Sequence, residues 1–389
     1  MSMQDLPVTI GVMLPRSRGY PQLAPNLLAG VELALAQLGQ QVAGRPLRLA
    51  VEEIGLGLAL AEQKARKLLS ADGVDFAVGL LPVNLAAALQ PLFAAQQVCL
   101  IACQAGENIP RRDEQGPFCF QNSLALWQAN YALGARAAAQ IGRRAILAQS
   151  FYDSGYDLPF AFRLGYEQAG GEVLRTFLTH RPPDPGPLAP IFELAERERA
   201  DLIFASYSGR PAGDFLRAYA AAGLGGRVPL LGSAFLIDEA SLEEHGEALL
   251  GAQTAIGWDA GAADARPFAE AFRARTGRPA DGFAALGYEA ARWIAAAVEA
   301  LGGDLTRPER THDALADASV AGPRGPLRVE PGTLCALPAA VTLREVRREG
   351  GALVQAPIAA LPPIGADDEP LGVIRDSLRS GWFNPYLCA

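Results

Sequence analysis

The sequence has few residues of the kinds that build metal, redox or nucleic-acid sites. Its 389 residues include five Cys in no CxxC pair, three widely spaced His and only two Lys, Lys64 and Lys67. Without ligand spacing among the Cys and His, a zinc site is not expected, and buried thiols are the default interpretation. The net charge is -8 and no basic cluster occurs, so nucleic acid is not expected as a partner.

Long apolar runs are also absent. Half of the residues are hydrophobic, yet no apolar run reaches the length that crosses a bilayer, so we expect no direct membrane insertion. No charged-then-apolar leader precedes the first expected strand at about Pro7. Two interpretations stay open, a cytoplasmic protein or a mature periplasmic chain whose leader has been removed.

Sequence motifs for catalysis or for a bound cofactor are missing as well. We find no G-x-S-x-G elbow, P-loop, HExxH or G-x-G-x-x-G after a strand. Glu52 and Glu53 are adjacent, so in a strand they point to opposite faces and cannot form a catalytic pair. We therefore predict a binding protein with no catalytic residues, metal or cofactor; turnover of a bound ligand would refute this.

What the chain does contain is a repeated alternation of strands and helices. The stretch Val74–Phe93 is typical: a buried strand ends at Gly79, a tight loop follows, and apolar residues recur at helical spacing from Leu85. Pro82 suits the first turn of that helix. The helix N-terminus can hold a ligand oxygen, and this loop lies at the carboxyl end of a strand, where open parallel sheets bind ligands.

The alternation starts a second time after residue 122. The first section carries expected strands at Val8–Leu14, Pro46–Glu52, Asp75–Val78 and Val98–Ala102, with helices between them. The second section, about 125–250, repeats the order, with an aromatic loop over 150–157. A third section adds helices, a Gly-Pro-Arg-Gly turn near 322–326 and a Pro-rich tail from Leu361. This order predicts an α/β fold with parallel sheets, in two lobes.

A family resemblance rests on short markers in a fixed order. They are Ile10-Gly11, Gly30 to Ala34, Gly44 to Leu47 with Glu52-Glu53, Val78-Gly79, Tyr288-Glu289-Ala290 and the turn from Gly322 to Val329. In this order the chain resembles the type I periplasmic solute-binding proteins of the leucine/isoleucine/valine-binding family. The last marker looks like the amide- and urea-binding branch.

The resemblance implies a clamshell of two Rossmann-like lobes joined by a three-strand hinge near 121–124, 250–253 and 330–340. The lobes would comprise residues 1–122 plus 253–332, and residues 123–252 plus 333–389 with the tail. A small molecule would bind in the cleft between them by hinge closure. The implied role is a periplasmic receptor that serves membrane transporter subunits. A cytoplasmic ligand sensor of a regulatory complex is the alternative, as is a branched-chain amino-acid-binding protein.

The chain departs from the amino-acid-binding members where they hold the ligand. Their Ser and Thr at the helix start correspond here to residues 82–85, their next Thr to residues 104–106, and their acidic residue in the second lobe to residues 232–235, which contain no acid. Burying an ammonium without a partner is costly, so a free amino acid is not the expected ligand.

The remaining candidate side chains are mostly apolar or aromatic, with a few polar groups. The predicted ligand-binding residues are Tyr20, Leu81, Val83, Asn84, Ala102, Gln104, Phe151, Tyr152, Tyr156, Ser206, Tyr207, Ser233, Phe235 and Trp258. Such walls suit a neutral, largely apolar molecule: aromatic, amide or lipid/sterol-like. Some of these aromatics could equally belong to the core. Asp153 and Asp157 are interpreted as turn formers rather than ligand contacts.

Overall fold

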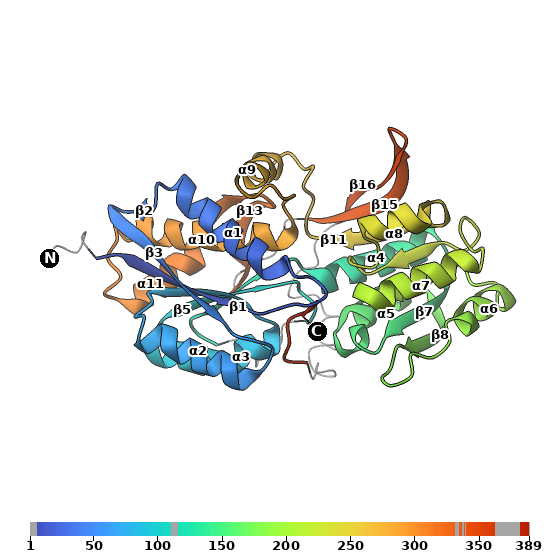
Figure 1. The fold of residues 1–389 in the computed structure, drawn as a ribbon, viewed down its shortest axis with the longest axis horizontal. Helices are drawn as coiled ribbons and strands as arrows, with labels where there is room; N and C mark the ends of the chain where they lie inside the picture. Colours follow the sequence, from blue (N-terminus) through green and yellow to red (C-terminus); the bar gives the residue numbers. More distant parts are fainter. Residues whose placement is uncertain are drawn as a thin grey trace. The chain divides into compact units, whose positions relative to one another are not determined.

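The computed structural model describes residues 6–109, 116–330, 334–336, 338, 340–361 and 382–388. Contacts divide the chain into two compact units: unit 1 comprises residues 1–124, 258–339 and 365–389, and unit 2 comprises 125–257 and 340–364. Each unit contains a complete sheet (Figure 1). This confirms the predicted α/β class with two lobes. No helix among the described residues has the length and hydropathy needed to span a membrane.

Unit 1 is built on a mixed sheet with the order β12-β13-β14-β6-β5-β4-β1-β3-β2. Its strands are β1 (Val8–Leu14), β2 (Gln41–Val42), β3 (Arg45–Glu53), β4 (Phe76–Leu80), β5 (Cys99–Gln104), β6 (Cys119–Ser123), β12 (Ser319–Gly322), β13 (Gly325–Glu330) and β14 (Cys335–Ala336). Its helices are α1 (Leu23–Gln37), α2 (Leu58–Ser70), α3 (Val83–Gln96), α9 (Arg266–Thr276), α10 (Gly282–Ala300) and α11 (Pro308–Asp317). The central strands are parallel, whereas β2, β12 and β13 add antiparallel pairs at the two edges.

Unit 2 has a smaller sheet with the order β16-β15-β11-β10-β9-β7-β8. Its strands are β7 (Arg144–Ser150), β8 (Glu172–Thr179), β9 (Leu202–Ser206), β10 (Leu230–Gly232), β11 (Gln253–Ile256), β15 (Val341–Glu349) and β16 (Ala352–Leu361). Its helices are α4 (Leu126–Gln140), α5 (Leu158–Gln168), α6 (Ala189–Arg197), α7 (Gly209–Ala221) and α8 (Glu239–His245). The β15–β16 pair is an antiparallel hairpin on an otherwise parallel sheet.

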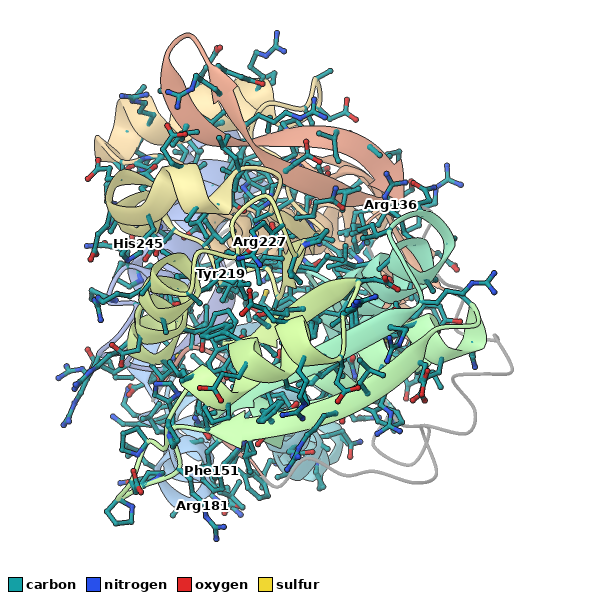
Figure 2. All side chains as sticks on the ribbon, turned by 90° about the vertical axis from the view of Figure 1, so that its right-hand side faces the viewer. Arg136, Phe151, Arg181, Tyr219, Arg227 and His245 are labelled. Atoms are coloured by element: carbon teal, nitrogen blue, oxygen red, sulfur yellow. The ribbon has the colours of Figure 1, made fainter. Side chains whose placement is uncertain are left out.

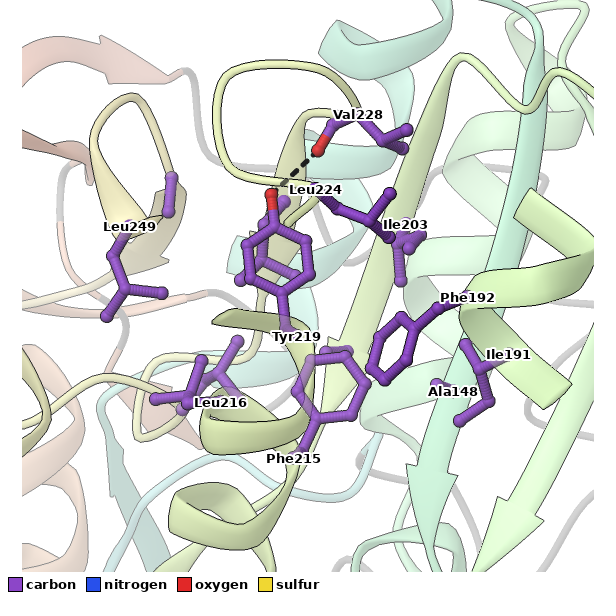
Figure 3. Close-up of a cluster of buried hydrophobic side chains, with 14 of the residues drawn as sticks. Ala148, Ile191, Phe192, Ile203, Phe215, Leu216, Tyr219, Leu224, Val228 and Leu249 are labelled. Carbon is purple, nitrogen blue, oxygen red and sulfur yellow. Dashed lines mark hydrogen bonds between the residues drawn. The ribbon is translucent and has the colours of Figure 1, made fainter. Parts of the chain in front are cut away.

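Helices cover both faces of each sheet, as apolar strands without polar alternation require. In unit 1, α2 and α3 pack on one face, while α1 and α10 lie on the other (Figure 1). In unit 2, the core under α6 and α7 contains Phe192, Phe215 and Tyr219 (Figure 3). The Tyr219 hydroxyl donates to the Val228 carbonyl at 2.8 Å, so this buried ring also satisfies its polar atom.

Glycine permits one close helix crossing in each unit. A Cβ at Gly30 in α1 would lie 2.0 Å from the Ala284 carbonyl oxygen in α10. A Cβ at Gly134 in α4 would lie 2.2 Å from the Phe162 carbonyl oxygen in α5. Backbones at this distance leave no room for a side chain. Gly30, an element of the family marker, is therefore required for packing.

The tail packs differently from the prediction, which assigned it to the second lobe. The described tail residues 382–388 contact unit 1, where Asn84 Nδ2 donates to the Trp382 carbonyl at 3.0 Å and Ser17 Oγ donates to the Leu387 carbonyl at 2.5 Å. Residues 362–381, which form most of the predicted tail, lie outside the described residues. The sequence alone could not assign the tail because these partners are about 300 or more residues away.

Candidate functional site

In unit 1, the candidate residues lie at one edge of the sheet. Strands β1, β4 and β5 are parallel neighbours, so the loops that follow them meet at their common carboxyl edge. The predicted residues Tyr20, Leu81, Val83, Asn84 and Gln104 lie in or beside these loops. The chain here folds as the sequence predicts: strand, tight turn and helix start.

The start of α3 is the main polar feature of this edge. Pro82 is the N-cap residue, with extended backbone and no side-chain cap, and the first helical hydrogen bond runs from the Ala86 N–H to the Pro82 carbonyl. The N–H groups of the first turn thus meet no capping side chain. The macrodipole adds partial positive charge at this point, which favours a ligand oxygen.

The loop after β5 carries polar side chains that the sequence analysis did not select. Glu107 and Asn108 are buried, as is the predicted Gln104. In the described part of the chain, neither side-chain polar atom of Asn108 has a hydrogen-bond partner, and the same holds for Gln104 Nε2. Such atoms cost about 1–3 kcal/mol each when left unpaired, so a bound molecule that met them would be stabilised. The signal was the adjacent polar pair Glu107-Asn108 within three to four residues of the end of a buried strand.

Two predicted residues of unit 1 belong to the core instead. Leu81 and Ala102 are fully buried in the apolar cluster beneath α2 and α3. Trp258 also belongs to unit 1 and packs edge-on against Phe268, with ring centroids 6.0 Å apart. Tyr20 is in the loop after β1, where its N–H donates to Ser17 Oγ at 2.9 Å.

In unit 2, the corresponding edge is formed by β7, β9 and β10, which are also parallel neighbours. The aromatic loop after β7 is tied to β8, because the Phe151 N–H donates to the Thr179 carbonyl at 2.8 Å. Figure 2 labels Phe151, which directly follows β7, and Arg181, which lies two residues after the end of β8. Tyr152 and Tyr156 meet edge to face with centroids 5.4 Å apart, and their hydroxyls lie 3.0 Å apart. Tyr156 is buried, so the half-buried Tyr152 presents the accessible ring surface of this pair.

Asp153 organises the same loop, as the turn-former interpretation predicts. Its buried carboxylate accepts from Ser150 Oγ at 2.5 Å and from the Ser208 N–H at 3.1 Å. The Asp153 N–H donates back to Ser150 Oγ at 2.9 Å. The carboxylate therefore joins the loops that follow β7 and β9. Ser208 was not selected from sequence, because only the fold brings it to Asp153.

The other predicted residues of unit 2 divide between core and edge. The Tyr207 ring stacks on Phe215 with centroids 4.7 Å apart, and its hydroxyl lies 2.9 Å from Thr179 Oγ1, so it belongs to the core; burial raises its pKa. Ser206 Oγ is buried with no partner among the described residues. Ser233 Oγ donates to the Tyr207 carbonyl at 3.5 Å. The loop with the half-buried Phe235 is held by Arg344, whose Nη2 donates to the Ala234 carbonyl at 3.1 Å.

The described residues contain no group of three or more His, Cys, Asp or Glu side chains that could hold a metal ion. All five cysteines are free and buried, which confirms the interpretation of buried thiols. Burial raises the pKa of Cys99 and Cys119 to about 12, so both thiols are neutral. The two edges offer amide donors, hydroxyls and aromatic rings, beside the buried carboxyl groups of Glu107 and Asp153. Whether the predicted residues touch a ligand stays a prediction.

Comparison with known proteins relates the chain to solute-binding proteins. A family model described as periplasmic binding protein matches residues 7–336. The Leu/Ile/Val-binding protein homolog 6 of Brucella abortus (strain 2308) is 26% identical over 334 residues, which cover 83% of this chain and 84% of the relative.

Solved structures agree in fold. An ABC transporter substrate-binding protein from Sphaerobacter thermophilus has a TM-score of 0.81 and 28% identity, covering 92% of this chain and 99% of its own. An ABC transporter solute-binding protein from R. palustris, in complex with benzoate, has a TM-score of 0.75 and 26% identity, covering 93% and 98%. A leucine-binding protein from Thermotoga maritima MSB8 has a TM-score of 0.69, 19% identity and coverage of 92% and 99%, which shows the shared fold alone.

Proposed function

The chain belongs to the periplasmic binding protein family, whose members bind small molecules without catalysis, and we propose that it is the solute receptor of an ABC transporter. The observation that carries this proposal is the family match over residues 7–336, together with structural relatives named as transporter components. We propose that the ligand binds between the two lobes, that the lobes close over it by hinge motion, and that the protein works in the periplasm beside membrane transporter subunits.

Among the ligand classes predicted from the sequence, we propose a small aromatic molecule. The edge-to-face pair of Tyr152 and Tyr156 lies at the strand ends of unit 2, where the half-buried Tyr152 ring is partly accessible and the buried Tyr156 ring packs against it. Each buried CH₂ equivalent contributes about 0.8 kcal/mol, so contact area can supply much of the affinity. The R. palustris relative in complex with benzoate supports this class. An amide is the second ligand class that we propose, and a lipid- or sterol-like molecule is the third.

The proposed anchor for the ligand oxygen is the start of α3, with no ionised partner. The first-turn N–H groups of α3 lack a side-chain cap, and Gln104 Nε2 is a buried donor with no partner in the described structure. Neutral donors of this kind hold a carbonyl, hydroxyl or amide oxygen. We therefore propose that the ligand is neutral, which separates this chain from a receptor for free amino acids.

Calorimetry with three solutes tests the proposal: benzamide, benzoate and leucine. We expect benzamide to bind at least as tightly as benzoate and leucine not to bind tightly. Much tighter binding of benzoate than of benzamide would show that the site selects a negatively charged ligand. That result would refute the proposal of a neutral ligand. Tight leucine binding would favour the branched-chain amino-acid alternative.

A matched pair of tyrosine variants tests where the aromatic ligand binds. Replacing Tyr156 by Ala removes one ring of the pair, and we expect weaker binding by roughly tenfold or more. The control is Tyr131→Ala, because Tyr131 is a tyrosine of the same unit whose hydroxyl meets Gln168 at the surface. Equal affinities for the two variants would exclude Tyr156 from the site.

Cell fractionation and affinity capture distinguish the receptor from the cytoplasmic sensor. A receptor is expected in the periplasmic fraction and bound to transporter subunits. A stable cytoplasmic complex with a regulatory protein would favour the sensor.

A further inference from the structure

The segment Trp382–Cys388, here called the tail segment, lies outside the part of the chain that matches the family model, which ends at residue 336. It nevertheless contacts the edge of unit 1 that carries the candidate site, and Figure 1 draws it in dark red beside α3. The residues that define the family match therefore include no counterpart of the tail segment.

Two hydrogen bonds and one electrostatic contact tie the tail segment to residues that follow three neighbouring strands. Ser17 follows β1, and its Oγ donates to the Leu387 carbonyl at 2.5 Å. Asn84 follows β4, and its Nδ2 donates to the Trp382 carbonyl at 3.0 Å. Glu107 follows β5. Burial raises the pKa of the Cys388 thiol to about 12, and the nearby Glu107 carboxylate adds to that rise. The tail segment therefore spans the carboxyl edge of β1, β4 and β5.

The tail segment is also packed as a structural element. Tyr386, Leu387 and Cys388 are buried, with at most 3% of each exposed. Internal hydrogen bonds shape it: the Cys388 N–H donates to the Pro385 carbonyl at 3.0 Å, and Asn384 Nδ2 donates to the Cys388 carbonyl at 3.1 Å. Exposing three such side chains would reduce the population of an opened state by a factor on the order of 1,000. If the tail segment had to be displaced each time a ligand bound, the apparent affinity of the protein for that ligand would fall by the same factor.

We propose that the tail segment is a fixed wall of the ligand site in unit 1, and that it limits the size of the solute this site accepts. It engages the side-chain amide of Asn84, which the sequence analysis assigned to the ligand. The segment thus occupies a position at this edge where a larger ligand would otherwise meet Asn84. This inference rests on the proposed function for the site. Whether the tail segment is a fixed cover can be tested without any ligand.

Thiol labelling tests the fixed cover on the full chain. Cys388 is buried and its pKa is raised, so we expect maleimide to modify it on the order of 1,000 times more slowly in the native protein than in the unfolded protein. Peptide mass spectrometry identifies the site, and Cys388→Ser is the control that must lose this signal. Rapid labelling of Cys388 in the native state, with or without an added aromatic acid, would show a mobile lid and overturn the proposal.

Ligand size tests the wall itself, using the neutral probes benzamide and the larger 2-naphthamide. We expect the intact chain to favour benzamide, and Tyr386→Ala or deletion of residues 382–389 to shift the affinity ratio toward 2-naphthamide by about tenfold, as removal of a few methylene-sized contacts predicts. Circular dichroism and thermal melting confirm that each variant folds. An unchanged ratio in folded variants would refute the wall. If neither amide binds the intact chain, the proposed neutral aromatic ligand is wrong, whereas the labelling result still decides whether the cover is fixed.

Discussion

The two units satisfy their buried polar centres by different chemistry. In unit 1, the side chains of Arg324 and Glu289 form an ion pair at 2.6 Å and are 3% and 0% exposed. Arg324 also donates to the Ser123 carbonyl and to Asn122 Oδ1, each at 2.5 Å. In unit 2, the Asp153 carboxylate is held by the hydroxyl of Ser150 and the N–H of Ser208. One centre therefore uses opposite charges, and the other uses neutral donors.

The difference follows from what each centre joins. Arg324 lies in the turn between β12 and β13 and fixes the end of β6, at the point where the chain leaves unit 1 after residue 124. Segments about 200 residues apart in sequence meet there, so several strong hydrogen bonds from one guanidinium hold them. Asp153 joins loops only 55 residues apart within one edge of a sheet. The comparison predicts that unit 1 is the more sensitive to loss of a single polar side chain.

The largest expected effect comes from Arg324→Met. Removing the guanidinium leaves Glu289 as a buried, unpaired carboxylate, and we expect the free energy of unfolding of unit 1 to fall by about 3–5 kcal/mol. Denaturant-induced unfolding measures the loss of stability, and amide hydrogen exchange shows whether that loss lies in unit 1. The control is Arg328→Met, because Arg328 is an exposed Arg on the adjacent strand. Equal stability of the two variants would show that the ion pair contributes nothing.

Asp153→Ala is expected to have an intermediate effect, in unit 2. The change leaves the Ser208 N–H and the Ser150 hydroxyl without their acceptor, which costs about 1–3 kcal/mol of unfolding free energy. Chemical denaturation followed by hydrogen exchange of unit 2 amides measures it. Glu243→Ala removes an exposed carboxylate of the same unit and should change little. A loss as large as that of Arg324→Met would contradict the proposed difference between the units.

The smallest expected effect is the pH dependence that His180 gives to unit 2. Burial lowers the pKa of His180 from 6.5, with Asp214 opposing the shift and Arg210 supporting it. Because the folded state disfavours the protonated ring, the unfolded state binds the proton first as pH falls below about 6.5. We therefore expect the stability of the wild-type chain to fall further than that of His180→Asn between pH 7.5 and 5. Parallel melting curves across this range would rule out a lowered pKa.

Local patterns predicted much of the fold. Apolar runs identified β1 and β4, and helical spacing identified α3 and α10, because the signal for these elements lies within each segment. Several elements were missed, among them α8 and β16. The α8 helix begins at a local cap, where the Ser241 N–H donates to Asp238 Oδ1 at 2.8 Å, so its signal was present. The β16 strand is rich in Ala and contains Pro357, and it exists because it pairs with β15.

The sequence by itself determined the alternation of strands and helices, the resemblance to a solute-binding family and the aromatic character of the loop after β7, since each depends on neighbouring residues. Only the tertiary structure decided which candidates are core, as for Leu81, Ala102 and Tyr207, and which distant groups meet, as for Arg324 with Glu289 and Asn84 with Trp382. The physical reason is that burial and pairing over hundreds of residues are properties of the packed chain. No local pattern carries them.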